Sequence, residues 1–321
     1  MNRMTERERW ITALERKPLT GRVPTFELVF YLTMEAFGKM HPEHRNYAQW
    51  DQMEAKEQRL QIEDVAQLYV DIARRYEHSA IFVQPTMPNI DAFMRLLDAI
   101  REISGDEYFL GTHGDPTFSL PDGEHMAEFS YKMADDPQGL LDEAQRRLDW
   151  HIDKAQILAK HGVLDGFFMC ADYCFNSGPF LSPRLFRKYV TPFLTESIAT
   201  YRELGFYVIK HTDGNIMPIL DQLVEANPHA LHSIDPMAGV DIAEVKRLVG
   251  DKVCLIGNVD CSKLDTGTEE EVIESTRYAL QSGMPGGGYI FSTSNCVYTG
   301  MPLERYELMM DVWRKEGNYP A

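Results

Sequence analysis

An alternation along the whole chain constrains the fold more than any other feature. Short apolar runs rich in β-branched and aromatic residues recur between longer segments with helical periodicity. The runs are nearly continuous in apolar character, which is typical of strands covered on both faces by other structure. We predict eight strands, at 22–29, 78–85, 107–114, 163–174, 207–214, 230–236, 253–260 and 288–295.

The connecting segments have helix start and stop signals. The clearest helix runs from the N-cap Thr268, with Glu271 completing a capping box, to Gly283. Further helices are predicted at 182–204, 217–226 and 241–250. Strands joined by helix-length connections pair in parallel, because a parallel crossover needs a dozen or more residues.

Eight such units predict a closed (β/α)₈ TIM barrel. A doubly wound open sheet is the alternative, and it fits less well because no strand is followed by a G-x-G-x-x-G turn. Residues 1–21 are expected to form a helix that caps the N-terminal end of the barrel, and residues 31–76 to form helices inserted after the first strand. Without a linker or repeat, residues 1–321 are expected to form one domain.

Charge and composition narrow the partners. The 321 residues include 32 Lys and Arg against 49 Asp and Glu, a formal charge of −17. That balance disfavours nonspecific binding to nucleic acid or to an anionic membrane. The N-terminus has no apolar targeting segment, and no run approaches the roughly 18 apolar residues of a membrane span. The cysteines are too sparse for a disulfide scaffold. We therefore expect a cytoplasmic protein.

Polar side chains gather where the predicted strands end. In a barrel of this type the chemistry lies at the carboxyl ends of the strands. The residues expected there are Glu27, Gln84, His113, Asp115, Asp172, His211, Asp213, Asp235, Asn258, Asp260, Cys261, Asn295 and Cys296. Carboxylate, imidazole and thiol together favour a divalent metal, and a mixed set of nitrogen, oxygen and sulfur ligands most suits zinc.

The sharpest candidate within this set is the pair His211 and Asp213. Side chains at i and i+2 of a strand point to the same side, so the pair can hold one ion. Cys296 follows the glycine-rich last strand and can converge on the same mouth. Each has a structural alternative, since a histidine at a strand end is commonly hydrogen-bonded and a buried thiol is commonly inert.

Five blocks of sequence resemble the uroporphyrinogen decarboxylase superfamily, in order along the chain. They are "MTERERWITALERKPLTGRVPTFELVF", "DYCFNSGPFLSPRLFRKYVTPFL", "IKHTDGNIMPILDQLVE", "IDPMAGVDIAEVKRLVGDKVCLIGNVD" and "GMPGGGYIFSTSNCV". The resemblance implies a (β/α)₈ barrel but leaves the reaction open, because one fold hosts many chemistries.

The decarboxylases of this superfamily have an Arg-rich "RQAGR" segment after the first strand that binds substrate carboxylates. No arginine lies between Val23 and Met40 here, which argues against a porphyrinogen substrate. The sequence is more similar to the corrinoid-dependent methyltransferases, whose zinc ligands are an H-x-C pair after the fifth strand and a cysteine after the last. By position, His211 and Cys296 match, and Asp213 replaces the first cysteine. A carboxylate in place of a thiolate leaves a harder, more Lewis-acidic zinc.

This branch implies an O-demethylating methyltransferase. It is expected to take a methyl group from a methoxylated aromatic compound and pass it to Co(I) of a corrinoid on a separate protein, because the chain has no "DxHxxG" sequence of its own. Asp172 and Asp235 are expected to orient a ligand or a water, as supporting carboxylates do. Glu27, Tyr31, His113 and Tyr298 are expected to contact the substrate.

Three alternatives stay open. The chain can transfer methyl groups between a corrinoid and a thiol of the coenzyme M type, with zinc lowering the thiol pKa. It can be a decarboxylase of the wider superfamily, or a relative that keeps the barrel as a scaffold and has lost catalysis. Cys261 can also replace or supplement Asp213 as a metal ligand.

Overall fold

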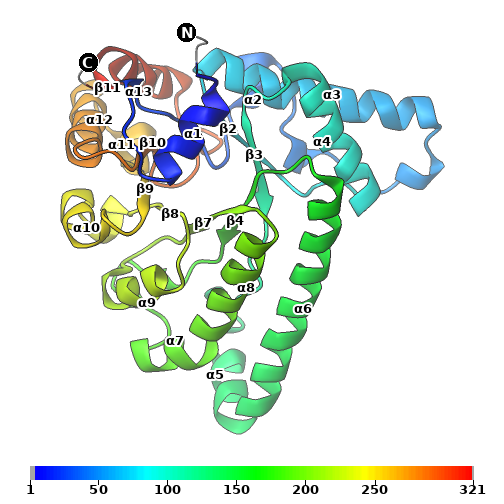
Figure 1. The fold of residues 1–321 in the computed structure, drawn as a ribbon, viewed down its shortest axis with the longest axis vertical. Helices are drawn as coiled ribbons and strands as arrows, with labels where there is room; N and C mark the ends of the chain where they lie inside the picture. The colour runs from blue at the N-terminus through cyan, green and yellow to red at the C-terminus, as the bar shows by residue number, and fades with distance from the viewer. Residues whose placement is uncertain (1–3, 320–321) are drawn as a thin grey trace.

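A curled sheet of seven parallel strands forms the centre of the computed structural model, which describes residues 4–319 (Figure 1). Neighbouring strands in the sheet follow the order β10, β9, β8, β7, β4, β3, β2. Their bounds are Tyr289–Thr293, Cys254–Val259, Ala230–His232, Tyr207–His211, Gly166–Cys170, Phe109–His113 and Ala80–Val83. Seven of the eight predicted strands are therefore confirmed, each within its predicted range.

The first predicted strand, 22–29, is not a regular strand. Its start forms the two-residue β1 (Gly21–Arg22), which pairs with β11 (Asn318–Tyr319) and brings the two ends of the described chain together. The rest runs beside β10 through isolated parallel bridges, Thr25 to Phe291 and Phe30 to Val297. On its other side the Ser79 N–H donates to the Thr25 carbonyl (2.6 Å). The segment thus fills the eighth place and confirms the barrel fold, but it leaves an irregular seam beside β2.

Helix α1 (Glu6–Leu14) closes the N-terminal end of the barrel, which confirms the predicted capping helix over a shorter range than 1–21; residues 1–3 of that range lie outside the described residues. Thr5 and Glu8 form a capping box that starts the helix. Trp10 is fully buried and its ring lies 4.8 Å from that of Phe26 and 5.5 Å from that of Phe109, measured between centroids. These rings fill the barrel interior at this end, and in barrels of this type the site lies at the opposite end, where the strands finish.

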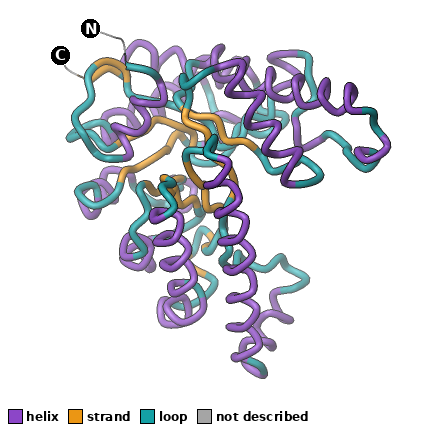
Figure 2. Tube along the Cα trace, turned by 45° about the vertical axis from the view of Figure 1, so that its right-hand side comes forward, coloured by secondary structure: helices purple, strands orange, loops and turns teal. Residues whose placement is uncertain are grey.

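Helices surround the sheet on its outer side, and Figure 2 shows the strands enclosed by them. Their bounds are α4 (Ile90–Ser104), α6 (Pro137–His161), α7 (Pro183–Tyr189), α8 (Thr191–Glu203), α9 (Leu220–Glu225), α10 (Ile242–Val249), α11 (Cys261–Thr266), α12 (Glu269–Gly283) and α13 (Leu303–Glu316). The predicted helix at 182–204 is divided at Val190, because Pro192 removes a backbone donor and starts a new helix. The capping box of α12 at Thr268 and Glu271 is confirmed.

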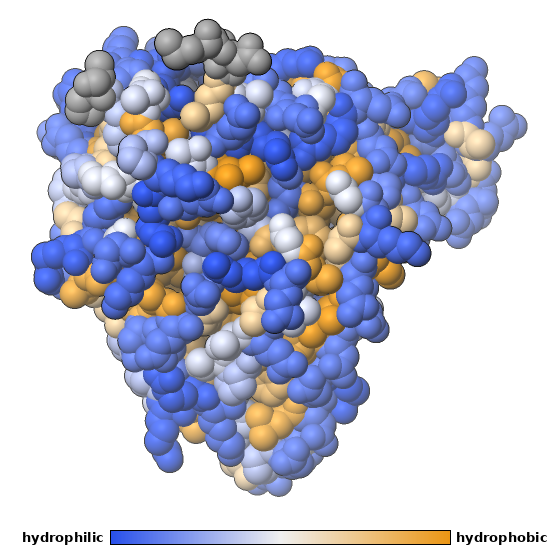
Figure 3. Space-filling model, viewed as in Figure 1, coloured by the Kyte–Doolittle hydropathy of each residue, from blue (hydrophilic) through white to orange (hydrophobic). Residues whose placement is uncertain are grey.

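Two insertions widen the barrel. Helices α2 (Thr33–Phe37) and α3 (Ala55–Tyr76) follow the first segment, which confirms the predicted insertion. After β3, α5 (Met126–Asp135) and the start of α6 extend well beyond the sheet (Figure 1). The outward surfaces of the helices are hydrophilic and apolar side chains show between them (Figure 3). Within residues 4–319, no helix has the length and apolarity to cross a bilayer.

Candidate metal centre

Strand β7 presents His211 to the mouth of the barrel. Tyr207, Ile209 and His211 alternate with outward residues, and Ile209 belongs to the packed interior of the barrel. The strand ends before Gly214, which has a positive φ of +79°. A Cβ atom there would lie 2.4 Å from the Cys174 carbonyl oxygen, so only glycine allows this close turn. The turn directs Asp213 back toward His211.

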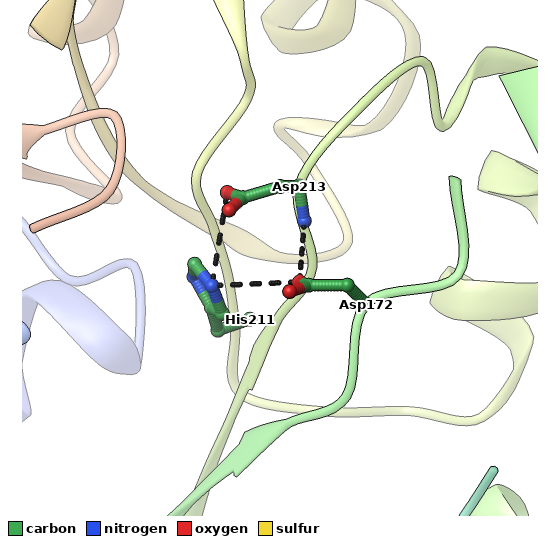
Figure 4. Close-up of side chains that lie close together, drawn as sticks. All are labelled: Asp172, His211 and Asp213. Atoms are coloured by element: carbon green, nitrogen blue, oxygen red, sulfur yellow. Dashed lines mark hydrogen bonds and ion pairs between the residues drawn. The ribbon is translucent and has the colours of Figure 1, made fainter. Parts of the chain in front are cut away.

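Asp172, His211 and Asp213 converge on one point at the mouth (Figure 4). The His211 Nε2 atom lies 3.7 Å from Asp172 Oδ1 and 3.7 Å from Asp213 Oδ1. One donor atom from each of the three residues lies within 4.8 Å of the others. The three residues come from two neighbouring strands, since Asp172 follows β4 (Gly166–Cys170).

Hydrogen bonds hold the two carboxylates in this arrangement. Asp172 Oδ1 accepts from the Asp213 backbone N–H (3.0 Å), which ties the two acidic residues to each other. Asp213 Oδ1 accepts from the Ser233 hydroxyl (2.7 Å), and Asp213 Oδ2 accepts from the Asn295 amide. Burial raises the pKa of Asp213, and the nearby charge of Asp172 raises it further.

His232, at the end of β8, sets the orientation of the His211 ring. The Nδ1 atoms of the two rings are 2.7 Å apart, and His232 is 1% exposed. Burial lowers the pKa of His232 well below its usual range, so its neutral form is favoured. With Nδ1 of His211 engaged, Nε2 is the nitrogen that faces the carboxylates and is free to bind an ion.

The donor set fits a divalent metal ion. Two carboxylates and an imidazole face each other, and neither carboxylate forms an ion pair with lysine or arginine in the described residues. The Asp213 side chain is 24% exposed and that of Asp172 is 46% exposed, and a cation between the two carboxylates would offset the repulsion of their like charges. Nitrogen and oxygen ligands of this kind are used by zinc and by harder divalent metals.

Cys296 lies at the same mouth but is not one of the three clustered residues. It follows β10 and is half-buried, and burial raises its pKa well above the usual range of a thiol, with the charges of Cys261 and Asp213 adding to the effect. The Cys261 thiol contacts the Cys296 carbonyl (3.6 Å). The predicted role of either thiol as a metal ligand stays a prediction, whereas the structure adds Asp172 to the candidate set.

Asp235 supports the turn that carries Asp213. Its Oδ2 atom accepts from the Gly214 backbone N–H (3.1 Å) and its Oδ1 from that of Met237 (2.9 Å). Both oxygens are therefore used to hold two loops at the mouth. The predicted role of Asp235 in orienting a ligand or a water stays a prediction.

The residues predicted to contact substrate lie in different surroundings. Tyr298 is 40% exposed on the loop after β10. The Tyr31 hydroxyl donates to Glu43, and its ring packs 4.7 Å from that of His41. His113 ends β3, and burial lowers its pKa. Glu27 is 5% exposed, in the seam beside β10. Their contact with substrate stays a prediction.

Sequence reasoning missed His232 and Ser233. Both follow the apolar start of β8, and "ALHSIDP" places His232 at the end of that strand, on the same side as Ala230. The signal was present, since an imidazole one strand away from His211 is a natural partner for it. The pairing of His211 with His232 across β7 and β8 is what identifies the role.

Comparison with known proteins identifies a family. The family described as uroporphyrinogen decarboxylase (URO-D) matches residues 124–316, which is more than half of the chain. Uroporphyrinogen decarboxylase from Shewanella halifaxensis is 27% identical over 230 residues, 66% of this chain and 60% of its own length. That from Thioalkalivibrio sulfidiphilus is 32% identical over 78 residues, 24% of this chain and 22% of its own length. The chain thus spans less than two thirds of either relative.

Solved structures extend the likeness of fold over nearly the whole chain. A methyltransferase from Methanosarcina mazei superposes with a TM-score of 0.74 at 16% identity, covering 98% of this chain and 99% of its own. A GH5_18 protein from Streptomyces cattleya gives 0.54 at 12% identity, covering 94% and 83%. Strands β4, β7, β8, β9 and β10 fall inside the matched family region, and so do Asp172, His211 and Asp213. With a family match over this part and the barrel around it, the chain belongs to the uroporphyrinogen decarboxylase family.

Proposed function

We propose that this protein is a metal-dependent methyltransferase. It removes a methyl group from an O-methyl compound, most simply a methoxylated aromatic, and passes it to Co(I) of a corrinoid on a partner protein. The family membership and the fold shared with a methyltransferase from Methanosarcina mazei support a reaction of this class. Zinc is the proposed metal.

One observation carries the proposal. The barrel mouth holds two carboxylates against His211 with no lysine or arginine paired to either one in the described part of the chain. Porphyrinogen decarboxylation needs positive charge to bind several substrate carboxylates. A negatively charged mouth without arginine between Val23 and Met40 suits a metal and an uncharged ether better.

The ligand residues have distinct tasks. His211, Asp172 and Asp213 would hold the ion, with His232, Ser233 and Asn295 fixing the orientation of two of them. When bound, a divalent metal supplies Lewis acidity toward the ether oxygen, where negative charge develops. Cys296 remains a candidate fourth ligand. Tyr31 and Tyr298 are proposed to lie against the aromatic ring of the substrate.

The test combines metal analysis with turnover. Protein purified without added metal is analysed for zinc, then incubated with a panel of methoxyarenes and a reduced corrinoid protein while the cobalt absorption spectrum is followed. We expect about one zinc per chain and methylation of cobalt that stops after chelation and returns on adding zinc. A protein that binds no metal and demethylates no ether contradicts the proposal.

The same assay separates the thiol alternative. A methylated corrinoid protein is offered together with a small thiol such as coenzyme M, and loss of the methylated cobalt spectrum is followed. Rapid methylation of the thiol without activity on any ether would favour a thiol methyltransferase. Turnover of methoxyarenes without thiol methylation supports the proposed direction.

A further inference from the structure

Glu27 is a buried acid with unequal surroundings at its two oxygens. Its Oε2 atom accepts from the Ser292 hydroxyl (3.3 Å), the Thr293 backbone N–H (3.3 Å) and the Thr293 hydroxyl. Its Oε1 atom is buried without a hydrogen-bond partner in the described residues. No lysine or arginine forms an ion pair with Glu27 in residues 4–319. An ionised carboxylate enclosed in this way is costly, whereas a neutral acid is tolerated.

The proton of the neutral acid has one suitable position. The lone pairs of Oε2 face three donors, so Oε2 acts as an acceptor. Oε1 has no hydrogen-bond partner in the described residues, which leaves it as the oxygen able to carry the proton. Burial raises the pKa of Glu27 to about 8, and hydrogen bonds from Thr293, Ser292 and Tyr306 offset that rise only in part. At neutral pH the side chain is mainly protonated.

Glu27 lines a cavity in the irregular seam. The cavity has a volume of about 30 Å³ and lies between the segment around Glu27, helix α3 and strand β2. Its polar lining comes from Glu27, His41, Tyr69, His78 and Gln84. A site of this size and polarity has room for a water molecule. Gln84 lies directly after β2 at the mouth, so the cavity extends from Glu27 toward the active-site end.

Neighbouring titratable groups leave the proton on Glu27. His78 and His41 line the same cavity, and burial lowers their pKa values to about 3 and about 4, so neither takes a proton at neutral pH. Tyr306 of α13 faces Glu27, and its hydroxyl lies 3.0 Å from His78 Nε2. Burial also keeps the thiol of Cys261 protonated, and raises the pKa of Tyr69 above its usual range. None of these groups competes for the proton.

We propose that Glu27 stores a proton in the wall of the barrel and delivers it, through water in the seam cavity, to the oxygen that leaves the methyl group. This inference rests on the proposed demethylation. The bond between the methyl carbon and the ether oxygen breaks, and the electron pair of Co(I) forms the new bond to carbon. The oxygen keeps the electron pair of the broken bond and takes the proton, leaving Glu27 as a carboxylate that is reprotonated from solvent.

The test uses Glu27→Gln in the full-length protein with its metal. Glutamine has the same shape, keeps an acceptor toward Thr293 and places an amide where Oε1 lies, but it carries no transferable proton. Glu63→Gln on the exposed surface of α3 is the matched control. Rates are measured for methoxyarenes whose phenol products span a wide range of acidity. We expect Glu27→Gln to slow the least acidic leaving groups on the order of 100-fold and the most acidic ones hardly at all.

Two further readouts separate proton delivery from a structural role. Wild-type activity should fall as pH rises through about 8, and the variant should lose that limb. An infrared difference spectrum between about pH 6 and pH 10 should show a protonated carboxyl band in the wild type that is absent in Glu27→Gln. Absence of this band from the wild type, or equal rates for both proteins with every substrate, overturns the proton role alone. A wild-type protein that demethylates nothing overturns the proposed function and this role together.

Discussion

Lys210 and His211 are neighbours on β7 and face opposite sides of the barrel wall. The charged groups on the two sides differ in whether they have partners of opposite charge. Lys210 is fully buried, and its Nζ donates to Asp115 Oδ2 (2.7 Å) and to the carbonyls of Ala171 (2.9 Å) and Met169 (3.1 Å). The three protons of the ammonium group are therefore satisfied. On the mouth side, His211 faces two carboxylates that lack a cationic partner.

This difference in charge compensation distinguishes a structural ion pair from a candidate functional site on the same strand. Asp115 also accepts from the Thr117 hydroxyl (2.6 Å), so the outer pair forms a complete network. A complete buried network rigidifies the fold and needs no ligand. An incomplete one at the mouth of a barrel is a candidate site, because an incoming cation completes it. Asp115 also lies at a strand tip, but its charge is compensated within the wall of the barrel, whereas Asp172 stays a candidate for the site.

The largest expected effect is on catalysis. His211→Ala should lower the demethylation rate at least about 1,000-fold, on the order of 4 kcal/mol, because a ligand and its Lewis acid are lost. The free energy of unfolding of the metal-free protein should change far less than for a substitution of Lys210. Rates come from the cobalt spectrum and unfolding from denaturant titration. Comparable activity in His211→Ala would show that the metal assignment is wrong.

The next effect is on stability. Lys210→Met should destabilise the fold by about 3–5 kcal/mol, because it leaves the charge of Asp115 buried without a partner. Chemical denaturation monitored by circular dichroism measures the loss. The double variant Lys210→Met with Asp115→Asn should recover part of it, since the uncompensated charge is then removed. No recovery in the double variant would mean that the lysine acts through packing.

A smaller effect is expected at the imidazole pair. His232→Phe removes the partner of His211 Nδ1 while keeping a ring of similar bulk, and should weaken metal binding by about 10–100-fold. Competition with a chromophoric chelator gives the affinity. Ser233→Ala serves as the comparison, because it removes a hydrogen bond to Asp213 and leaves the imidazole pair intact. If His232→Phe binds the metal as tightly as the wild type, His232 does not orient His211 for metal binding.

The smallest effect concerns acid stability of the outer pair. The charge of Lys210 and hydrogen bonds lower the pKa of Asp115 to about 2 against its burial, below the value of 3.8 for a free side chain. A group whose pKa falls on folding stabilises above its unfolded pKa and loses that contribution as pH falls toward the folded value. We expect the wild-type free energy of unfolding to decrease between about pH 4 and pH 2 more than that of Asp115→Asn. Parallel curves would exclude Asp115 as a source of acid sensitivity.

Much of the fold is readable from the sequence. Seven strands, the capping helix and the helical insertion after the first segment are confirmed because apolar runs, capping boxes and prolines act locally. The first strand is the exception. Its apolar run predicts a strand, but Pro24 has no backbone N–H to donate to a neighbouring strand. The segment also needs hydrogen-bond partners on both of its sides, and only the closed barrel supplies them.

The sequence predicts the type of site, a metal centre at the strand ends, but only some of the residues that form it. The spacing of His211 and Asp213 predicts that the two lie together on one side of a strand. The structure brings them together, but β7 ends at His211 and Asp213 belongs to the turn that follows it. Asp172 was expected to orient a ligand, but the distance from its Oδ1 to His211 Nε2 equals that of Asp213, which makes it a candidate ligand. The choice between a carboxylate and Cys296 depends on where loops from different strands meet.

The amino-acid order alone determined the alternation of strands and helices, the chemical types gathered at the strand ends and the absence of arginine between Val23 and Met40. Tertiary structure decided which of those side chains share a point, that Lys210 neutralises Asp115, and that Glu27 is enclosed in a seam. The reason is physical: periodicity and capping depend on neighbours a few residues away, whereas charge compensation and burial depend on atoms brought together from distant parts of the chain.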